Sequence, residues 1–144
     1  MHPYPHLYTV QATAATTGSV TLAAAGLPAL ATAPPVEFDG PGDLWSPETL
    51  LSGAVADCFV LSFRAVARAS RLEWTGLEVS VEGKLDRVEG RTHFTEFNVH
   101  ATLRVPAGTD AAQATKLLEK AEHVCLVSNS LVGQRHLHPN VIVG

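Results

Sequence analysis

Residues 46–70 read SPETLLSGAVADCFVLSFRAVARAS, and this stretch decides the fold. Ser46 is a good N-cap, Pro47 suits the first position of a helix, and Glu48 complements the positive end of the helix dipole. A helix of about 24 residues, or about 36 Å, is therefore predicted. From Glu48 to Phe63 its side chains are apolar or small on nearly every side, which indicates a helix that is buried on most faces.

Before this helix the chain shows β patterns. Residues 7–15 and 19–25 alternate loosely around a Thr-Thr-Gly turn, which predicts a β-hairpin. Residues 26–47 are rich in proline and glycine and predict a loop, with a short strand expected at Val36–Phe38.

After the helix, residues 77–105 contain two alternating runs that meet near Glu89-Gly90, which predicts a long antiparallel strand pair. The alternation slips between Phe94 and Phe97, as it does at a β-bulge. A second helix of about 15 residues is expected over 110–124, with Asp110 as its cap. A weakly alternating run from His136 to Val143 predicts a last strand.

The predicted order is β-β-(β)-α-β-β-α-β, which is an α+β fold with an antiparallel sheet around a long buried central helix. A length of 144 residues is that of one domain, so we expect a single domain over 1–144.

The composition excludes several classes of protein. A hydrophobic fraction of 46% with 17% charged residues excludes a disordered chain. A net charge of −4 argues against sequence-independent binding of nucleic acid. The apolar run Leu22–Ala31 is short and broken by glycine and proline, and the N-terminus lacks the pattern of a secretory signal, so no membrane partner is expected. Two cysteines are too few for a disulfide scaffold, and we expect a cytoplasmic protein with reduced thiols.

Charge is unevenly distributed along the chain. No lysine or arginine precedes Arg64, whereas five acidic residues do. Either this half presents a binding surface, or it is a small β-region built mostly from threonine, alanine and valine.

Three residues are candidates for chemistry, and each also has a plain structural role. Cys58 and Cys125 can be reactive thiols or small buried hydrophobes. Glu48 can act in a site or only stabilise the helix N-terminus. His136 and His138 project to one face of a strand, but no further ligand stands at metal-binding spacing, so no metal site is expected. No phosphate-binding, nucleotide-binding or serine-hydrolase motif is present.

Two motifs together resemble the OsmC/Ohr family, the osmotically inducible protein C and organic hydroperoxide resistance proteins. The first is SPETLL followed by ADC, in which Cys58 stands ten residues after Glu48. The second is AEHVCLVSNSL at 121–131, around Cys125. The long strands lie between the two motifs, as in the family, and the resemblance covers nearly the whole chain.

The resemblance implies a thiol-dependent peroxidase that reduces organic hydroperoxides to alcohols. Cys58 would be the peroxidatic cysteine, Cys125 the resolving cysteine, and Glu48 would help to hold the site together through an arginine. No bound cofactor is implied, but an external dithiol such as reduced lipoamide would regenerate the enzyme. The resemblance also implies an intertwined homodimer with active sites at the subunit interface.

The chain departs from the family in two places. The family's arginine in the first hairpin turn is absent, since the turn reads TTGS at 16–19. Arg135, Arg64 or a histidine such as His136 are candidates to replace it. Leu126 stands where the family usually has proline after the second cysteine.

Helix geometry bears on how Glu48 could act. On one straight helix Glu48 and Cys58 would lie about 15 Å apart along the axis and on different faces. Either the helix bends near Ser52-Gly53, or Glu48 reaches the Cys58 of another subunit. The second alternative agrees with the implied dimer.

The missing arginine motivates another function. A divergent member with weak or no peroxidase activity could bind a small hydrophobic ligand or sense oxidation. In either case we expect an apolar pocket lined by Leu44, Trp45, Leu50, Leu51 and Phe59, to which the N-terminal aromatics Tyr4 and Tyr8 could contribute. Such a pocket favours bulky organic molecules over hydrogen peroxide.

Overall fold

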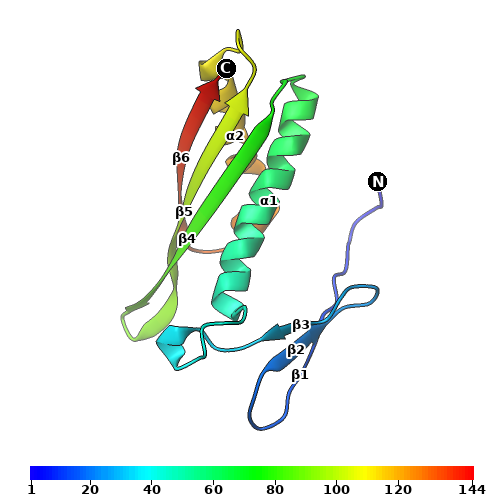
Figure 1. Ribbon diagram of the computed structural model, residues 1–144, viewed down its shortest axis with the longest axis vertical. Coiled ribbons are helices and arrows are strands. Elements are labelled where there is room, and N and C mark those ends of the chain that lie inside the picture. The colour runs from blue at the N-terminus through cyan, green and yellow to red at the C-terminus, as the bar shows by residue number, and fades with distance from the viewer. The chain divides into compact units, whose positions relative to one another are not determined.

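The computed structural model describes residues 1–144, which form two compact units, Met1–Leu50 and Leu51–Gly144. The chain has the predicted α+β fold, with two three-stranded sheets and a long helix between them in sequence (Figure 1). The long helix, α1, begins in the first unit and continues into the second.

The N-terminal unit contains an antiparallel sheet in the order β1-β2-β3. Its strands are β1 (Gln11–Thr13), β2 (Val20–Ala23) and β3 (Leu30–Thr32). The predicted hairpin is therefore confirmed, with shorter strands. The predicted strand at Val36–Phe38 is wrong, because this segment is a 3-10 helix, η1, in which the Phe38 amide donates to the Pro35 carbonyl at 2.9 Å.

Helix α1 (Pro47–Ala69) begins as the sequence predicts. The Thr49 amide donates to Ser46 Oγ at 3.1 Å, and the Ser46 amide donates to Thr49 Oγ1 at 2.9 Å. This reciprocal pair satisfies two backbone donors, in the manner of a capping box. Ser46 is buried, so the start of the helix is fixed from within the N-terminal unit.

The expectation of no membrane partner rested on the short run Leu22–Ala31, but the chain also contains a longer apolar helix. Helix α1 has 23 residues and a mean hydropathy of 1.6 over its most apolar window. By length and composition alone, such a helix could cross a membrane. One face of α1 packs in the hydrophobic core, through Val55, Phe59, Phe63, Val66 and Ala67.

The C-terminal unit is built on a sheet in the order β4-β5-β6. Strands β4 (Gly76–Val88) and β5 (Arg91–Val105) form the predicted long hairpin, and both turn residues, Glu89 and Gly90, have positive φ, as a tight hairpin turn requires. Lys84 pairs with Glu96 and Leu85 with Phe94, so Thr95 is an extra residue in β5. The predicted bulge between Phe94 and Phe97 is confirmed.

The sheet is mixed, which corrects the prediction that it is antiparallel. Strand β6 (Gln134–Val143) runs parallel to β5. Helix α2 (Ala111–Val124) and the short α3 (Leu126–Asn129), which the sequence did not predict, carry the chain back between these two strands. This connection is long enough to return the chain to the end of the sheet at which β5 begins, so β6 can run in the same direction as β5.

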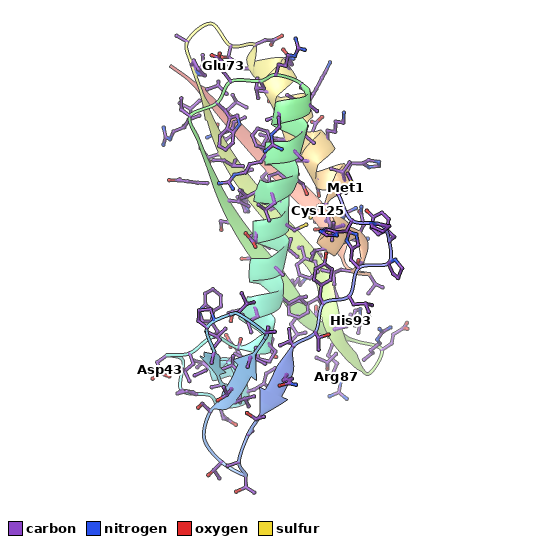
Figure 2. The ribbon with its side chains drawn as sticks, turned by 90° about the vertical axis from the view of Figure 1, so that its right-hand side faces the viewer. Met1, Asp43, Glu73, Arg87, His93 and Cys125 are labelled. Atoms are coloured by element: carbon purple, nitrogen blue, oxygen red, sulfur yellow. The ribbon has the colours of Figure 1, made fainter.

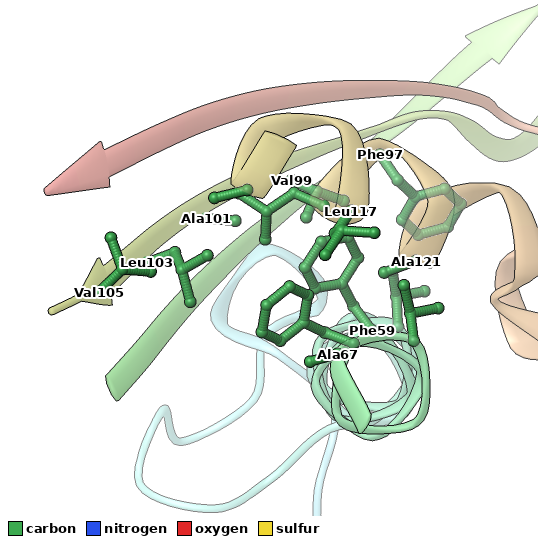
Figure 3. Packing of buried hydrophobic residues seen from close by; sticks show 14 residues of the cluster. Phe59, Ala67, Phe97, Val99, Ala101, Leu103, Val105, Leu117 and Ala121 are labelled. Carbon is green, nitrogen blue, oxygen red and sulfur yellow. The ribbon is translucent and has the colours of Figure 1, made fainter. Parts of the chain in front are cut away.

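Both long helices pack on one face of this sheet (Figure 3). Phe59 and Ala67 of α1 meet Val99 and other alternate residues of β5, while the buried residues of α2 close the cluster. At Gly83 of β4 an added Cβ would lie 2.6 Å from Ser52 Oγ of α1. The absence of a side chain at this position therefore lets the helix approach the sheet.

Candidate active site

Cys58 lies in α1 between two residues of the core, Val55 and Phe59, and is itself half-buried. Its Sγ is 3.9 Å from the hydroxyl of Ser62, one helical turn further on. The helix thus holds the thiol at the margin of the core, where it is less enclosed than its neighbours.

Cys125 occupies the junction between α2 and α3, where the backbone becomes extended (φ −64°, ψ 103°). Its amide donates to the Glu122 carbonyl at 3.2 Å, and its carbonyl accepts from the Asn129 amide at 2.9 Å. The side chain is only 1% exposed. The two helix ends therefore fix the backbone on both sides of a fully buried thiol.

The Cys58 thiol, 67 positions from Cys125 in the sequence, lies close enough to Cys125 in the C-terminal unit to affect its pKa. Burial raises the pKa of the Cys125 thiol, hydrogen bonds from the Ser128 side chain and backbone partly offset this, and the neighbouring Cys58 thiol raises the pKa further. Figure 2 shows Cys125 beside the middle of α1. No cation is among the groups that act on Cys125.

This arrangement is an asymmetric dithiol. One sulfur is half-buried and the other is enclosed and held in its protonated form by burial. Cys58 is therefore the more accessible of the two thiols to a reagent from solution.

Ser128 is the residue of this site that sequence reasoning did not single out. It is 4% exposed and stands three residues after Cys125, in the first turn of α3. A small hydroxyl residue one helical turn from a cysteine is the signal that could have identified it.

Glu48 lies in the first turn of α1, within the N-terminal unit. Its Oε2 atom is buried and has no hydrogen-bond partner. The ion pairs of the molecule both involve Lys84, on β4. The role of Glu48 therefore stays a prediction.

The same unit contains an apolar cavity of about 550 Å³. Its wall includes Glu48 and Leu50 and, among others, the apolar residues Val20, Leu22, Ala33, Phe38 and Pro47. The expected pocket is therefore present only in part. Phe59 is a core residue at 1% exposure, and Leu44, Trp45, Tyr4 and Tyr8 are exposed.

The three residues proposed to replace the arginine belong to the C-terminal unit. Arg135 donates from Nη1 to the Glu122 carbonyl at 3.2 Å and, with His136, lines a polar groove of about 660 Å³ beside α2 and α3. Arg64 is exposed on α1.

The exposed face of the C-terminal sheet carries three histidines on neighbouring strands. His138 of β6 stacks on His100 of β5 with ring centroids 4.4 Å apart, and His136 pairs in register with Asn98. No group of three or more metal-binding side chains is found.

Comparison with known proteins points to one family. A family model described as OsmC-like protein matches residues 40–137. The uncharacterized protein YmaD of Bacillus subtilis is 33% identical over 107 residues, which cover 72% of this chain and 71% of YmaD. An organic hydroperoxide resistance protein of Xanthomonas axonopodis pv. citri is 33% identical over 103 residues, covering 69% of this chain and 68% of that protein.

Solved structures show the same fold. An OsmC-like protein of unknown function from Vibrio cholerae superimposes with a TM-score of 0.83 at 16% identity. The superposition covers 96% of this chain and 100% of the Vibrio chain. An organic hydroperoxide resistance protein from Legionella pneumophila gives a TM-score of 0.76 at 26% identity, over 96% of this chain and 98% of its own.

Proposed function

Because the chain belongs to the OsmC/Ohr family, we propose that it acts, as a single domain over 1–144, as a cysteine-based peroxidase that reduces organic hydroperoxides to alcohols. Family membership and the hydroperoxide-resistance relatives support a redox protein of peroxide stress. The observation that supports the finer assignment is that the half-buried Cys58 thiol is a neighbour of the buried Cys125 thiol, whose pKa it raises.

The proposed reaction has three steps. The Cys58 thiolate attacks the terminal oxygen of the hydroperoxide, the O–O bond breaks, and the alkoxide takes a proton to leave as alcohol. The sulfur of Cys58, now a sulfenic acid, is attacked by Cys125, and water leaves as the disulfide forms. An external dithiol such as reduced lipoamide then exchanges with the disulfide and restores both thiols, so no bound cofactor is required.

The asymmetry of the pair supports this order of events. Cys58 is the less buried thiol and is the one that can meet a substrate. Cys125 is enclosed and has a raised pKa, which protects it from direct oxidation until the Cys58 sulfenic acid is beside it.

For Glu48 we propose a positioning role. Its unpaired carboxylate oxygen leaves it able to orient a cationic group or a hydrogen-bond donor that the N-terminal unit itself does not provide. The apolar cavity beside it favours a bulky organic hydroperoxide over hydrogen peroxide.

We further propose that the protein is a cytoplasmic homodimer. Large hydrophobic side chains remain exposed in both units, among them Trp45 at 52% and Leu61 of α1 at 53%. Only 28% of the most apolar window of α1 is buried within one chain. A second copy that covers this helix would remove the exposed apolar surface from water.

The test is stopped-flow consumption of cumene hydroperoxide in the presence of excess reduced lipoamide. The native chain should turn over quickly, Cys58→Ser should not turn over, and Ser62→Ala, which keeps the thiol, should retain most of the rate. Turnover that survives in Cys58→Ser would overturn the proposal.

A second function, binding of a small hydrophobic ligand, is favoured by the cavity of the N-terminal unit. The cavity has a size typical of ligand sites and a single unpaired polar group. If cumene hydroperoxide is consumed no faster than by a free thiol, this second function becomes the leading one.

A further inference from the structure

The polar groove of about 660 Å³ beside α2 and α3 has no part in the proposed peroxidase reaction. Its wall includes neither Cys58, Cys125 nor Glu48, and Ser128 is the one residue that it shares with the dithiol site. Its volume lies in the range of known ligand sites, and most of the side chains that line it are charged or polar. The groove is therefore a candidate binding site for a polar molecule.

Arg135 brings a half-buried guanidinium to this groove. Its Nη1 donates to the Glu122 carbonyl at 3.2 Å, and the same oxygen accepts from the Cys125 amide at 3.2 Å, so the end of α2 holds the side chain in place. Both ion pairs of the molecule involve Lys84, so no carboxylate oxygen of the chain lies within ion-pair distance of this guanidinium. Its remaining N–H groups are therefore available to a ligand, and their planar fork matches a carboxylate.

Two carboxylates of α2, those of Glu119 and Glu122, line the same groove, and neither takes part in an ion pair. They stand three positions apart, so they lie on one side of the helix. A simple anion would be attracted by Arg135 but repelled by the two carboxylates, and a simple cation would meet the opposite conflict. A molecule with one group of each charge satisfies both walls of the groove.

The remaining polar side chains suit a molecule with amide groups between its charges. Asn129 and Gln134 line the groove, and the Asn129 Nδ2 donates to the His123 carbonyl at 3.1 Å, which leaves its Oδ1 as an acceptor. Side-chain amides both donate and accept hydrogen bonds, as the peptide group does. Charged ends joined by amides describe a peptide.

We propose that this groove binds a short zwitterionic peptide, whose terminal carboxylate accepts from the Arg135 guanidinium while its terminal ammonium group donates to Glu119 and Glu122. This activity goes beyond the proposed peroxidase function. It requires neither thiol, so it is independent of whether Cys58 and Cys125 reduce hydroperoxides.

The test compares matched peptides by titration calorimetry of the full-length reduced chain at neutral pH. Trialanine has both terminal charges, N-acetyl-trialanine lacks the ammonium group, and trialanine amide lacks the carboxylate. Trialanine should bind at least about tenfold more tightly than either blocked form, because each block removes a charge-assisted hydrogen bond. Equal affinity for all of these peptides, or no binding of trialanine, would overturn the proposal.

Variants of the groove test which residue recognises which end of the peptide. Arg135→Gln should weaken trialanine binding at least about tenfold and remove its advantage over trialanine amide. Glu119→Gln combined with Glu122→Gln should remove the advantage of trialanine over N-acetyl-trialanine. Arg64→Gln, at an exposed arginine of α1 outside the groove wall, is the matched control and should bind all peptides as the native chain does.

The proposal fails if the variants of Arg135 and of the two glutamates keep the native preferences, even where trialanine binds. Arg135→Gln also removes the hydrogen bond to the Glu122 carbonyl, so its far-ultraviolet circular dichroism is compared with that of the native chain. If this variant does not fold, the double glutamate variant decides the outcome. Cumene hydroperoxide turnover, measured separately, decides the peroxidase function in either case.

Discussion

The thiol of Cys58, in the middle of α1, is a neighbour of the thiol of Cys125, at the junction of α2 and α3, and raises its pKa. The hydroxyl of Ser62 lies near the first, and that of Ser128 hydrogen-bonds the second. Serine hydroxyls are thus the polar partners of both sulfurs. This relationship determines what the site can do and how it should respond to pH.

The pH dependence of disulfide formation should follow the raised pKa of Cys125. Because burial raises this pKa, the thiolate fraction of Cys125 is small at neutral pH and grows about tenfold per pH unit until the pKa is reached. After one equivalent of hydroperoxide, the rate of disulfide formation should therefore increase throughout the range from about pH 6 to pH 9. Acid quenching followed by mass spectrometry measures it, and a rate independent of pH would contradict this role of Cys125.

Ser128→Ala should slow the same step. The substitution removes a hydrogen bond that lowers the Cys125 pKa, so the pKa rises further and the rate at neutral pH should decrease by about threefold to tenfold. At a pH above both pKa values the two proteins should react equally fast. Ser130→Ala, a matched change at an exposed hydroxyl of the same region, should have no effect.

Cys125→Ser should allow one oxidation and then stop. Without the second thiol, the Cys58 sulfenic acid has no intramolecular partner, so it accumulates or oxidises further. Trapping with dimedone followed by mass spectrometry should find the adduct on Cys58 in this variant and not in the native chain. Normal cycling with reduced lipoamide would show that Cys125 is not the resolving residue.

Gly83→Ala should destabilise the C-terminal unit. An added Cβ would lie 2.6 Å from Ser52 Oγ and 3.1 Å from the Phe94 ring, so the hydroxyl must rotate and the ring must move. We expect a loss of about 1–3 kcal/mol in the free energy of unfolding, measured by urea titration. At Gly76, in the same strand, the atom nearest to an added Cβ lies 3.9 Å away. Gly76→Ala should therefore change the free energy of unfolding little. Equal stability of the two variants would contradict close packing at Gly83.

The proposed dimer can be tested at Leu61. A charge on the exposed apolar face of α1 should oppose association, so light scattering should give about twice the chain mass for the native protein and the chain mass for Leu61→Lys. Val88→Lys, at an exposed hydrophobic residue of the β4–β5 hairpin, is the control and should remain a dimer. A native protein that scatters as a monomer at micromolar concentration would exclude the proposed assembly.

Local signals in the sequence predicted the elements that depend on local interactions. The Ser46 cap, the Glu89-Gly90 turn and the bulge near Thr95 each follow from a few adjacent residues, and all three are confirmed. The strand predicted at Val36–Phe38 is wrong because consecutive prolines before it favour a tight turn, which closes into the 3-10 helix η1.

Features that depend on residues far apart in the sequence were harder to predict. The alternation of β6 is the same for either direction of pairing, so only the path through α2 makes it parallel to β5. The pairing of Cys58 with Cys125 was implied by family resemblance alone, since no local pattern brings residues so far apart together. The cavity beside Glu48 depends on three strands and η1, so it could be found only in the structure.

The position of the two thiols also links redox state to the entropy of the unfolded chain. A covalent bond between Cys58 and Cys125 would close a ring that contains the whole β4–β5 hairpin and α2. Tethering a ring of this size removes enough freedom from the denatured ensemble to stabilise the folded state by about 4 kcal/mol. The C-terminal unit would then resist heat and proteolysis best in the disulfide form. Reduction to the dithiol, the form that reacts with hydroperoxide, would lower its stability.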